Sequence, residues 1–283
     1  MRRAVWYVIG GICSVQLGAA LAKDLFGRVD PTAMVFLRLV TSAVVLLLLA
    51  RPVLRGRTRQ DWLVVVGFGI SLGTMNWAIY QSFARIPLGI AVTIEFVGPL
   101  AIAVLCSRRA RDLVWVGLAA AGVLLLGFDP AGVTVTGVLF ALLAGAAWAA
   151  YILLSADTGR RWQGVDGLAV ASVVATLLIL PYAVARGGRT LLEPEILAIG
   201  AAVGLLSSVI PYSLELAALR RMKPSAFGIL MSLEPAAAAL AGIVVLHEFL
   251  TPVQLVAMAC VIAASVGATR SGAALPQAEP APD

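Results

Sequence analysis

The stretch PLGIAVTIEFVGPLAIAVLC, residues 87–106, decides the fold class. Its 20 residues include one charge, Glu95, and roughly 20 apolar residues are what a helix needs to cross a hydrocarbon layer about 30 Å thick. Short connections containing Pro, Gly or charged residues separate it from similar stretches. These lie at 4–22, 32–50, 62–83, 113–128, 135–154, 167–185, 196–217, 225–246 and 252–269. The sequence therefore predicts an all-α polytopic membrane protein with ten transmembrane helices.

The composition agrees with this class. Of the 283 residues, 61% are hydrophobic and 13% are charged, and the mean hydropathy is +0.98. A soluble domain carries about 25% charged residues, so a soluble enzyme, a disordered chain and a disulfide-stapled secreted module are excluded. An alternative interpretation of residues 4–22 is a cleavable signal peptide after the basic start Met1-Arg2-Arg3. We expect this segment to be retained, because its removal would leave an odd number of spans.

The distribution of basic residues predicts the orientation. With a cytoplasmic N-terminus, 15 of the 21 Lys and Arg residues fall in cytoplasmic segments and 5 in outer segments, and Arg38 lies inside a span. The positive-inside rule then predicts a multi-pass protein of the inner membrane with both termini in the cytoplasm. Residues 270–283 are Pro/Ala-rich and are expected to form a disordered cytoplasmic tail. The net charge of +6 needs no nucleic-acid partner.

The chain also predicts an internal repeat. An offset of 136 residues aligns the first four spans with spans six to nine, and it superposes Ser71 on Ser207, Arg85 on Arg221 and Pro99 on Pro235. We expect one five-helix repeat at 1–134 and another at 135–269, and five spans per repeat make the second repeat inverted. Inverted repeats are typical of secondary transporters with a substrate site near the midplane. A duplicated scaffold without transport is the alternative.

Charged residues at bilayer depth are candidate site residues, because each costs at least a few kcal/mol there. Glu95 and Glu234 lie ten residues beyond Arg85 and Pro224, or about 15 Å deep at a rise of about 1.5 Å per residue. Arg38 lies six residues into its span, and Glu215 lies closer to the cytoplasmic end. The neutral hydrogen-bonding candidates are Gln16, Asn76, Tyr80, Gln81 and Tyr212.

Two prolines predict helix breaks beside these glutamates. Pro99 and Pro235 have no amide hydrogen, so the carbonyls four residues back, those of Glu95 and Met231, lose their helical partner. A freed carbonyl next to a carboxylate suits a polar cavity at the interface between the repeats.

Three of the charged positions keep a purely structural interpretation. Arg38 either binds an anionic group of a substrate or only neutralises Glu95 or Glu234. For Glu215, an ion pair with the basic loop Arg220-Arg221-Lys223 is favoured. His247-Glu248 is expected to end a helix and not to bind a metal, because it contains the single histidine and lacks nearby ligands. No cofactor and no metal are expected.

Residues 76–104, NWAIYQSFARIPLGIAVTIEFVGPLAIAV, closely resemble the segment typical of threonine/homoserine exporters in the drug/metabolite transporter superfamily. Residues 208–256 show the same resemblance, including the SLEP run, and the likeness extends over residues 4–269. It implies a ten-helix inverted-repeat fold of the EamA type that exports small amino acids. The family pattern is matched at Asn76, Tyr80, Pro87, Gly89, Glu95, Gly98, Pro99, Tyr212, Glu215, Glu234 and Pro235.

These observations predict an exporter of small polar amino acids, threonine- or homoserine-like, driven by proton antiport. A buried glutamate that holds either a proton or the substrate ammonium, never both, is the minimum device for such exchange. The alternatives are a broad-specificity drug or metabolite carrier, a non-transporting assembly factor and an intramembrane enzyme. An enzyme is not expected, because the sequence has no histidine pair, no Asp-rich metal motif and no Ser/His arrangement. The expected partners are a small amino acid, protons and the lipid bilayer, and a homodimer is a further candidate.

Overall fold

The computed structural model describes residues 2–106, 112–128 and 132–270, which form helices without strands. Residues 271–283 of the expected tail lie outside this part of the chain. The short helices are η1 (Leu25–Gly27), η3 (Leu126–Phe128) and η4 (Gly188–Leu192), and the π-helix η5 covers Leu205–Val209. The α-helices are α1 (Arg2–Asp24), α2 (Pro31–Ala50), α3 (Arg59–Phe83), α4 (Leu88–Glu95), α5 (Val97–Cys106), α6 (Leu113–Leu125), α7 (Val135–Arg161), α8 (Asp166–Gly187), α9 (Pro194–Gly204), α10 (Ile210–Leu219), α11 (Pro224–Met231), α12 (Glu234–Leu246) and α13 (Pro252–Arg270).

Local sequence signals set where several helices begin. Asp30 accepts a hydrogen bond from the Thr32 amide over 2.8 Å, directly before a proline at the first position of α2. Thr58 and Asp61 form a reciprocal capping box at the start of α3. Thr134 caps α7 in the same way as Asp30 caps α2. These caps satisfy backbone amides that have no partner within the helix.

The predicted placement of the spans is confirmed, since an apolar helical segment lies at each of the ten predicted positions. Within the described residues, nine segments are long and apolar enough to cross a membrane, and α6 is a shorter apolar helix of 13 residues. Three of the ten predicted spans consist of more than one helix: the fourth of α4 and α5, the eighth of α9, η5 and α10, and the ninth of α11 and α12. The protein is therefore a polytopic α-helical membrane protein.

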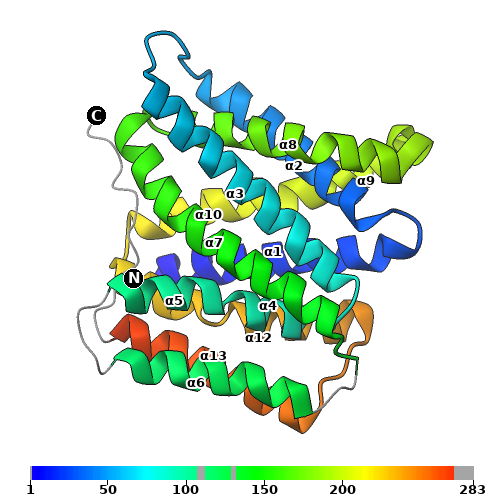
Figure 1. Cartoon of the computed structure of the whole chain (residues 1–283), viewed down its shortest axis with the longest axis vertical. Coiled ribbons are helices and arrows are strands. Elements are labelled where there is room, and N and C mark those ends of the chain that lie inside the picture. The colour runs from blue at the N-terminus through cyan, green and yellow to red at the C-terminus, as the bar shows by residue number, and fades with distance from the viewer. Residues whose placement is uncertain (1, 107–111, 129–131, 271–283) are drawn as a thin grey trace.

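Helix α1 lies at the centre of the arrangement (Figure 1), where it contacts α9, η5, α10, α11 and α12 of the second half of the chain. Around it, α2 packs on α8 and α9, α3 packs on α7 and α8, and α6 packs on α13. The beginning of α1 and the end of α13 lie at the same edge of the molecule (Figure 1). An even number of membrane crossings requires this placement.

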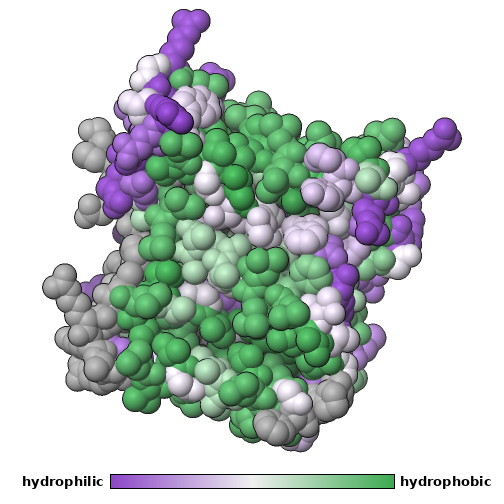
Figure 2. Space-filling view, viewed as in Figure 1, coloured by the Kyte–Doolittle hydropathy of each residue, from purple (hydrophilic) through white to green (hydrophobic). Residues whose placement is uncertain are grey.

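The surface has the polarity of a membrane protein. Figure 2 shows apolar side chains across the middle of the visible face and polar side chains gathered toward two opposite edges. Leu48 and Leu49 are each 71% exposed, and many other large apolar residues are exposed with them. A water-soluble monomer rarely exposes an apolar patch of this extent, so this belt is the surface that faces lipid.

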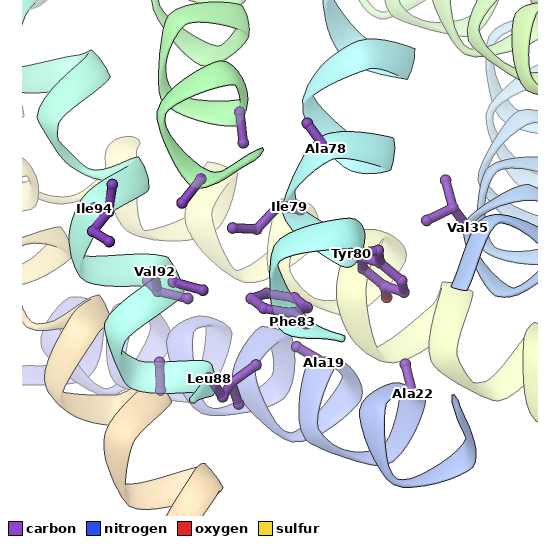
Figure 3. Packing of buried hydrophobic residues seen from close by; sticks show 14 of the residues in the cluster. Ala19, Ala22, Val35, Ala78, Ile79, Tyr80, Phe83, Leu88, Val92 and Ile94 are labelled. Carbon is purple, nitrogen blue, oxygen red and sulfur yellow. The ribbon is translucent and has the colours of Figure 1, made fainter. Parts of the chain in front are cut away.

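The buried core includes the place where α1, α3 and α4 meet. Figure 3 shows Tyr80 and Phe83 at the end of α3 above Ala19 and Ala22 of α1, and Leu88 of α4 lies next to them. The Tyr80 and Phe83 rings are 5.5 Å apart between centroids, an arrangement favoured for aromatic pairs. Small residues on α1 let the aromatic side chains approach its backbone, as is common between membrane helices.

Two helices are interrupted at equivalent places. Helix α4 ends at Glu95 and α5 begins at Val97, whereas α11 ends at Met231 and α12 begins at Glu234. The first non-helical residues, Phe96 and Ser232, are separated by the predicted repeat offset. The two interruptions begin three residues before Pro99 and Pro235, whose missing amide hydrogens remove a helical hydrogen bond at each place.

Candidate functional site

The two intramembrane glutamates lie at the two helix interruptions, one in each half of the chain. Glu95 is the last residue of α4 and is 8% exposed, and Glu234 is the first residue of α12. Glu95 is close enough to both Glu234 and Arg38 for their charges to interact. The fold thus brings the three charged groups singled out in the sequence into one region.

Glu234 is held by a residue of the central helix. The side-chain amide of Gln16 donates a hydrogen bond of 3.0 Å to Oε1 of Glu234. The second carboxylate oxygen and the amide oxygen of Gln16 are buried and have no hydrogen-bond partner among the described residues. Buried polar atoms without partners are costly. This pair therefore offers free acceptors to a cationic group or to a proton.

Arg38 is held by uncharged groups. One guanidinium nitrogen donates to the carbonyl oxygen of Ser207 over 3.2 Å and the other to the Tyr80 hydroxyl over 3.5 Å, and the guanidinium carbon lies 5.6 Å from the Tyr80 ring centroid. Nε of Arg38 is buried without a hydrogen-bond partner, and no ion pair joins Arg38 to a carboxylate within the described residues. Among these residues, the positive charge of Arg38 is therefore not neutralised by a direct ion pair.

The sequence analysis did not identify the feature that positions Arg38. Pro211 has no amide hydrogen for the carbonyl of Ser207, four residues back, or for that of Leu206, five residues back in the π-helical spacing of η5. Arg38 occupies the first of these carbonyls, and the Ser14 hydroxyl donates to the second over 2.6 Å. The signal was Pro211 itself, inside an apolar span and four residues after the repeat-matched Ser207.

Next to Arg38 lies a small pocket with several hydroxyl groups. Asn76 is 4% exposed and donates to the carbonyl of Leu72 over 2.9 Å, which leaves its side-chain oxygen as an acceptor. The hydroxyls of Ser42 and Ser207 are buried without partners among the described residues. The sequence analysis used Ser207 only as a repeat match and did not single out Ser42, because nothing in the local sequence marks either hydroxyl as part of a site. The pocket is lined by Arg38, Leu39, Ser42, Leu46, Leu72, Asn76, Ser172 and Ser208.

Glu215 lies against the central helix and not in the basic loop. A Cβ atom added at Gly11 of α1 would be 3.7 Å from the Glu215 side chain, and Glu215 interacts electrostatically with Glu234. Among the described residues, no ion pair joins Glu215 to Arg220, Arg221 or Lys223. The favoured interpretation of this residue is therefore not what the structure shows. The glycine of α1 leaves room for the long side chain, which turns inward toward Glu234.

Two further candidates are placed as follows. Tyr212 lies in α10, and its side chain is outside the described part of the chain. Gln81 donates to the Thr32 hydroxyl over 3.1 Å and accepts from Arg85, so it is occupied away from the charged cluster.

The carbonyl of Glu95 packs against another helix. A Cβ atom added at Gly145 of α7 would be 2.7 Å from this oxygen, so only glycine allows the approach. The expected cavity beside the carbonyl is therefore replaced by a helix contact. The charges that act on Glu95 are those of Glu234 and Arg38.

Interrupted apolar helices around buried charges define the class of this protein, a polytopic secondary transporter. A sequence model of the EamA-like transporter family matches residues 135–270. The chain is 42% identical over 261 residues, 91% of its length, to the threonine/homoserine exporter RhtA of Escherichia coli K12, of which it covers 88%. The chain therefore belongs to the EamA-like transporter family, and it is a membrane transporter and not an enzyme.

Other relatives agree with this assignment. The chain is 42% identical over 90% of its length to the threonine/homoserine exporter RhtA of Salmonella typhimurium LT2, and it covers 88% of that protein. It is 32% identical over 65% of its length to the uncharacterized transporter YwfM of Bacillus subtilis 168, covering 59% of it. A solved crystal structure superposes with a TM-score of 0.61 at 19% identity, covering 94% of this chain and 96% of the other. That likeness supports the fold alone.

Proposed function

We propose that this transporter exports small polar amino acids of the threonine and homoserine type, in exchange for protons. The observation that carries the proposal is the separation of two groups inside the same membrane-embedded region. Among the described residues, Arg38 has no ion-pair partner, and Oε2 of Glu234 is buried without a hydrogen-bond partner. A zwitterionic amino acid has the complementary pair of charges. The names of the 42% identical relatives, which are threonine/homoserine exporters, support the same substrate class.

Arg38 binds the substrate carboxylate in this proposal. Its Nε and the nearby Ser207 hydroxyl, which have no hydrogen-bond partner within the described part of the chain, supply donors for an anionic group. Arginine presents its donors as a planar fork that matches the two oxygens of a carboxylate. The neutral partners of Arg38 fix the side chain without cancelling its charge.

Glu95 and Glu234 bind the substrate ammonium and the proton. The free oxygen of Glu234 faces a buried environment in which an unneutralised carboxylate is costly. Either a proton or an ammonium group removes this cost, and both cannot occupy one carboxylate. Binding of the amino acid therefore displaces the proton, which couples export to proton entry.

The neighbouring pocket supports a small hydroxylated substrate, because half of its lining residues carry a hydroxyl or amide group and none of them is aromatic. Ser42, Asn76, Ser172 and Ser208 bring hydroxyl and amide groups to its lining, and these suit a hydroxylated side chain. A drug site is expected to be mainly apolar and aromatic. This is the difference between the proposed substrate and the alternative of a broad efflux carrier.

The two-repeat organisation and the topology belong to the same proposal. We take residues 1–134 and 135–269 as inverted repeats, with both termini in the cytoplasm of a cell with an inner membrane. The family match beginning at residue 135 supports the boundary. Labelling of introduced cysteines from each side tests the orientation, and an external C-terminus would contradict it. A homodimer is a further proposal, which light scattering of the solubilised protein tests.

Export from proteoliposomes tests the function. The wild-type protein should release preloaded threonine and homoserine faster when a proton gradient is imposed, in a screen across the twenty amino acids. The double variant Glu95→Gln/Glu234→Gln should lose this acceleration. Glu195→Gln is the matched control, because Glu195 pairs with Arg28 at an exposed position in the first turn of α9. Wild-type coupling in the double variant would end the carboxylate mechanism.

A further inference from the structure

Lys23 and Glu248 form an ion pair that the transport roles above do not use. Nζ of Lys23 lies 2.5 Å from Oε1 of Glu248, and the two side chains are 14% and 21% exposed. Lys23 belongs to the end of α1, and Glu248 follows α12. The contact therefore joins the first half of the chain to the second half at the membrane face where α1 ends.

The same two side chains hold the start of α4. Lys23 donates to the carbonyl of Ile86 over 2.7 Å, and Oε2 of Glu248 accepts from the amide of Leu88 over 2.8 Å. Pro87, at the N-cap of α4, provides no side-chain cap. Glu248 thus satisfies an amide that has no partner within the helix, at the end where negative charge is favoured. Helices α1, α4 and α12 are tied together at one point.

Each of these three helices leads directly to the charged site. Helix α4 has eight residues and ends at Glu95, a length of about 12 Å. On α1, Gln16 and Lys23 are two turns apart and share one face. Helix α12 begins at Glu234 and ends two residues before Glu248. A displacement at the ion pair is therefore carried to both glutamates by short, rigid helices.

A sharp backbone turn directs Glu248 to this place. His247 ends α12 in the left-handed region with φ of 56°, which is uncommon for a residue other than glycine. The amide of Glu248 then donates to the carbonyl of Gly242 over 3.1 Å. The chain folds back along α12, and a Cβ atom at Gly242 would be 3.2 Å from the Glu248 carboxylate.

Other ion pairs of the described residues differ in placement or exposure. Arg161 pairs with Asp61 of α3 over 3.4 Å, and this pair does not involve α1, α4 or α12. Arg28 and Glu195 also join the two halves, but their side chains are 56% and 62% exposed. Exposed pairs contribute about 0–1 kcal/mol, so the Arg28–Glu195 pair is a weak link by comparison.

We propose that Lys23, Glu248 and the start of α4 form a gate that closes the transport pathway at this membrane face and positions Glu95 through α4. The inference rests on the proposed transport function, and with the proposed topology this face is the outer one. The partial exposure suits a contact that forms and breaks in each cycle. Both charges become hydrated when the gate opens, so opening leaves no charge in hydrocarbon.

Cross-linking tests whether the contact must open. In a background with Cys13, Cys106 and Cys260 replaced by alanine, Lys23→Cys/Glu248→Cys is treated with a short bifunctional methanethiosulfonate. Threonine export should fall to the background of empty liposomes and return after reduction, whereas each single-cysteine variant, treated in the same way, should export at its own untreated rate. A fully cross-linked protein that exports at its untreated rate would overturn the gate.

Water access gives a second test that needs no substrate. In the same background without native cysteines, Ser14→Cys on α1 reports on the site. Its labelling by an impermeant maleimide from this face should become about tenfold faster with Glu248→Gln or Lys23→Gln. Glu195→Gln should leave the labelling rate unchanged, and melting temperatures verify that each variant is folded. Labelling of folded Glu248→Gln and Lys23→Gln at the same rate as the protein that keeps Lys23 and Glu248 would contradict the gate. Absent export by the wild-type protein, with the labelling response intact, would instead reject the proposed function.

Discussion

The two interrupted helices share a backbone plan and differ in what they place at equivalent positions. In the first, the helix ends at Glu95, and Gly98 follows the interruption. In the second, the offset of 136 residues places Met231 and Glu234 at these positions. The acidic residue thus lies before one interruption and after the other.

Packing explains why the acidic residue lies on different sides of the two interruptions. A Cβ atom at Gly98 would overlap the carbonyl oxygen of Gly145 in α7, so the first interruption needs glycine where the second has glutamate. Glu234 instead faces α1, where Gln16 binds it. Met231 is partly buried beside Val8 and Ile12 of α1. The same helix interruption therefore allows a tight helix contact in the first half and places a hydrogen-bonded carboxylate in the second half.

Gly98→Ala should have the largest effect, because it tests the packing side of the comparison. The added methyl group collides with the backbone of α7, which cannot move as a flexible side chain can. Overpacking of this kind costs about 1–3 kcal/mol or more, so little folded protein should remain after solubilisation, as measured by size-exclusion chromatography and thermal melting. The matched control is Gly117→Ala in α6, where a Cβ atom meets nothing within 4 Å. An equally stable Gly98→Ala protein would remove the packing explanation.

Glu95→Gln and Glu234→Gln test the chemical side. We expect Glu95→Gln to abolish proton-driven net export, because the glutamine amide mimics the protonated carboxylic acid and cannot release a proton. Residual substrate binding should then be nearly independent of pH between 5 and 8. Glu234→Gln should retain some coupling, since Glu95 remains. Proton-coupled efflux from proteoliposomes separates the two variants, and the opposite order would make Glu234 the main proton site.

The spans and both helix interruptions could be predicted from the sequence, because each depends on local features. Apolar length sets a span, and Pro99 and Pro235 remove a hydrogen bond within their own helices. The proximity of Gln16 to Glu234 could not be predicted in this way. These residues are 218 positions apart, and only the placement of α1 against α12 brings them together.

The interpretation of Glu215 shows the same limit. Its distance along the chain to Arg220 suggested an ion pair on one helix end, yet the space left by Gly11 of α1 directs the side chain inward. Likewise, the π-helix η5 needed both Pro211 and its contact with α1. Long-range packing decides which polar groups form the site, and short-range patterns list only the candidates.

Arg38→Lys should have a smaller effect than the glutamate variants. The offset of 136 residues pairs Arg38 with Val174, which packs against Gly69, so the charge occurs in one half only. Lysine keeps the charge and loses the planar fork. The apparent affinity for threonine should fall about tenfold while the folded protein and its maximal rate persist. Normal affinity would favour general charge balance over direct binding of the carboxylate.

Ser42→Ala should have the smallest effect. It tests whether the pocket beside Arg38 binds the hydroxyl group of the substrate side chain. The equivalent position in the second half is Leu178, which is 37% exposed, so the hydroxyl belongs to one half as the charge does. Loss of one hydrogen bond of about 0.5–1 kcal/mol should weaken the apparent affinity for threonine about two- to fivefold. Alanine has no hydroxyl, so competition by alanine should not change. Ser155→Ala is the control, because that hydroxyl bonds only within α7, to Ile152. If Ser42→Ala lowers the apparent affinities for threonine and for alanine equally, the pocket supports the position of Arg38 and does not select the substrate hydroxyl. The difference between the two halves at this position then serves only the placement of the charge.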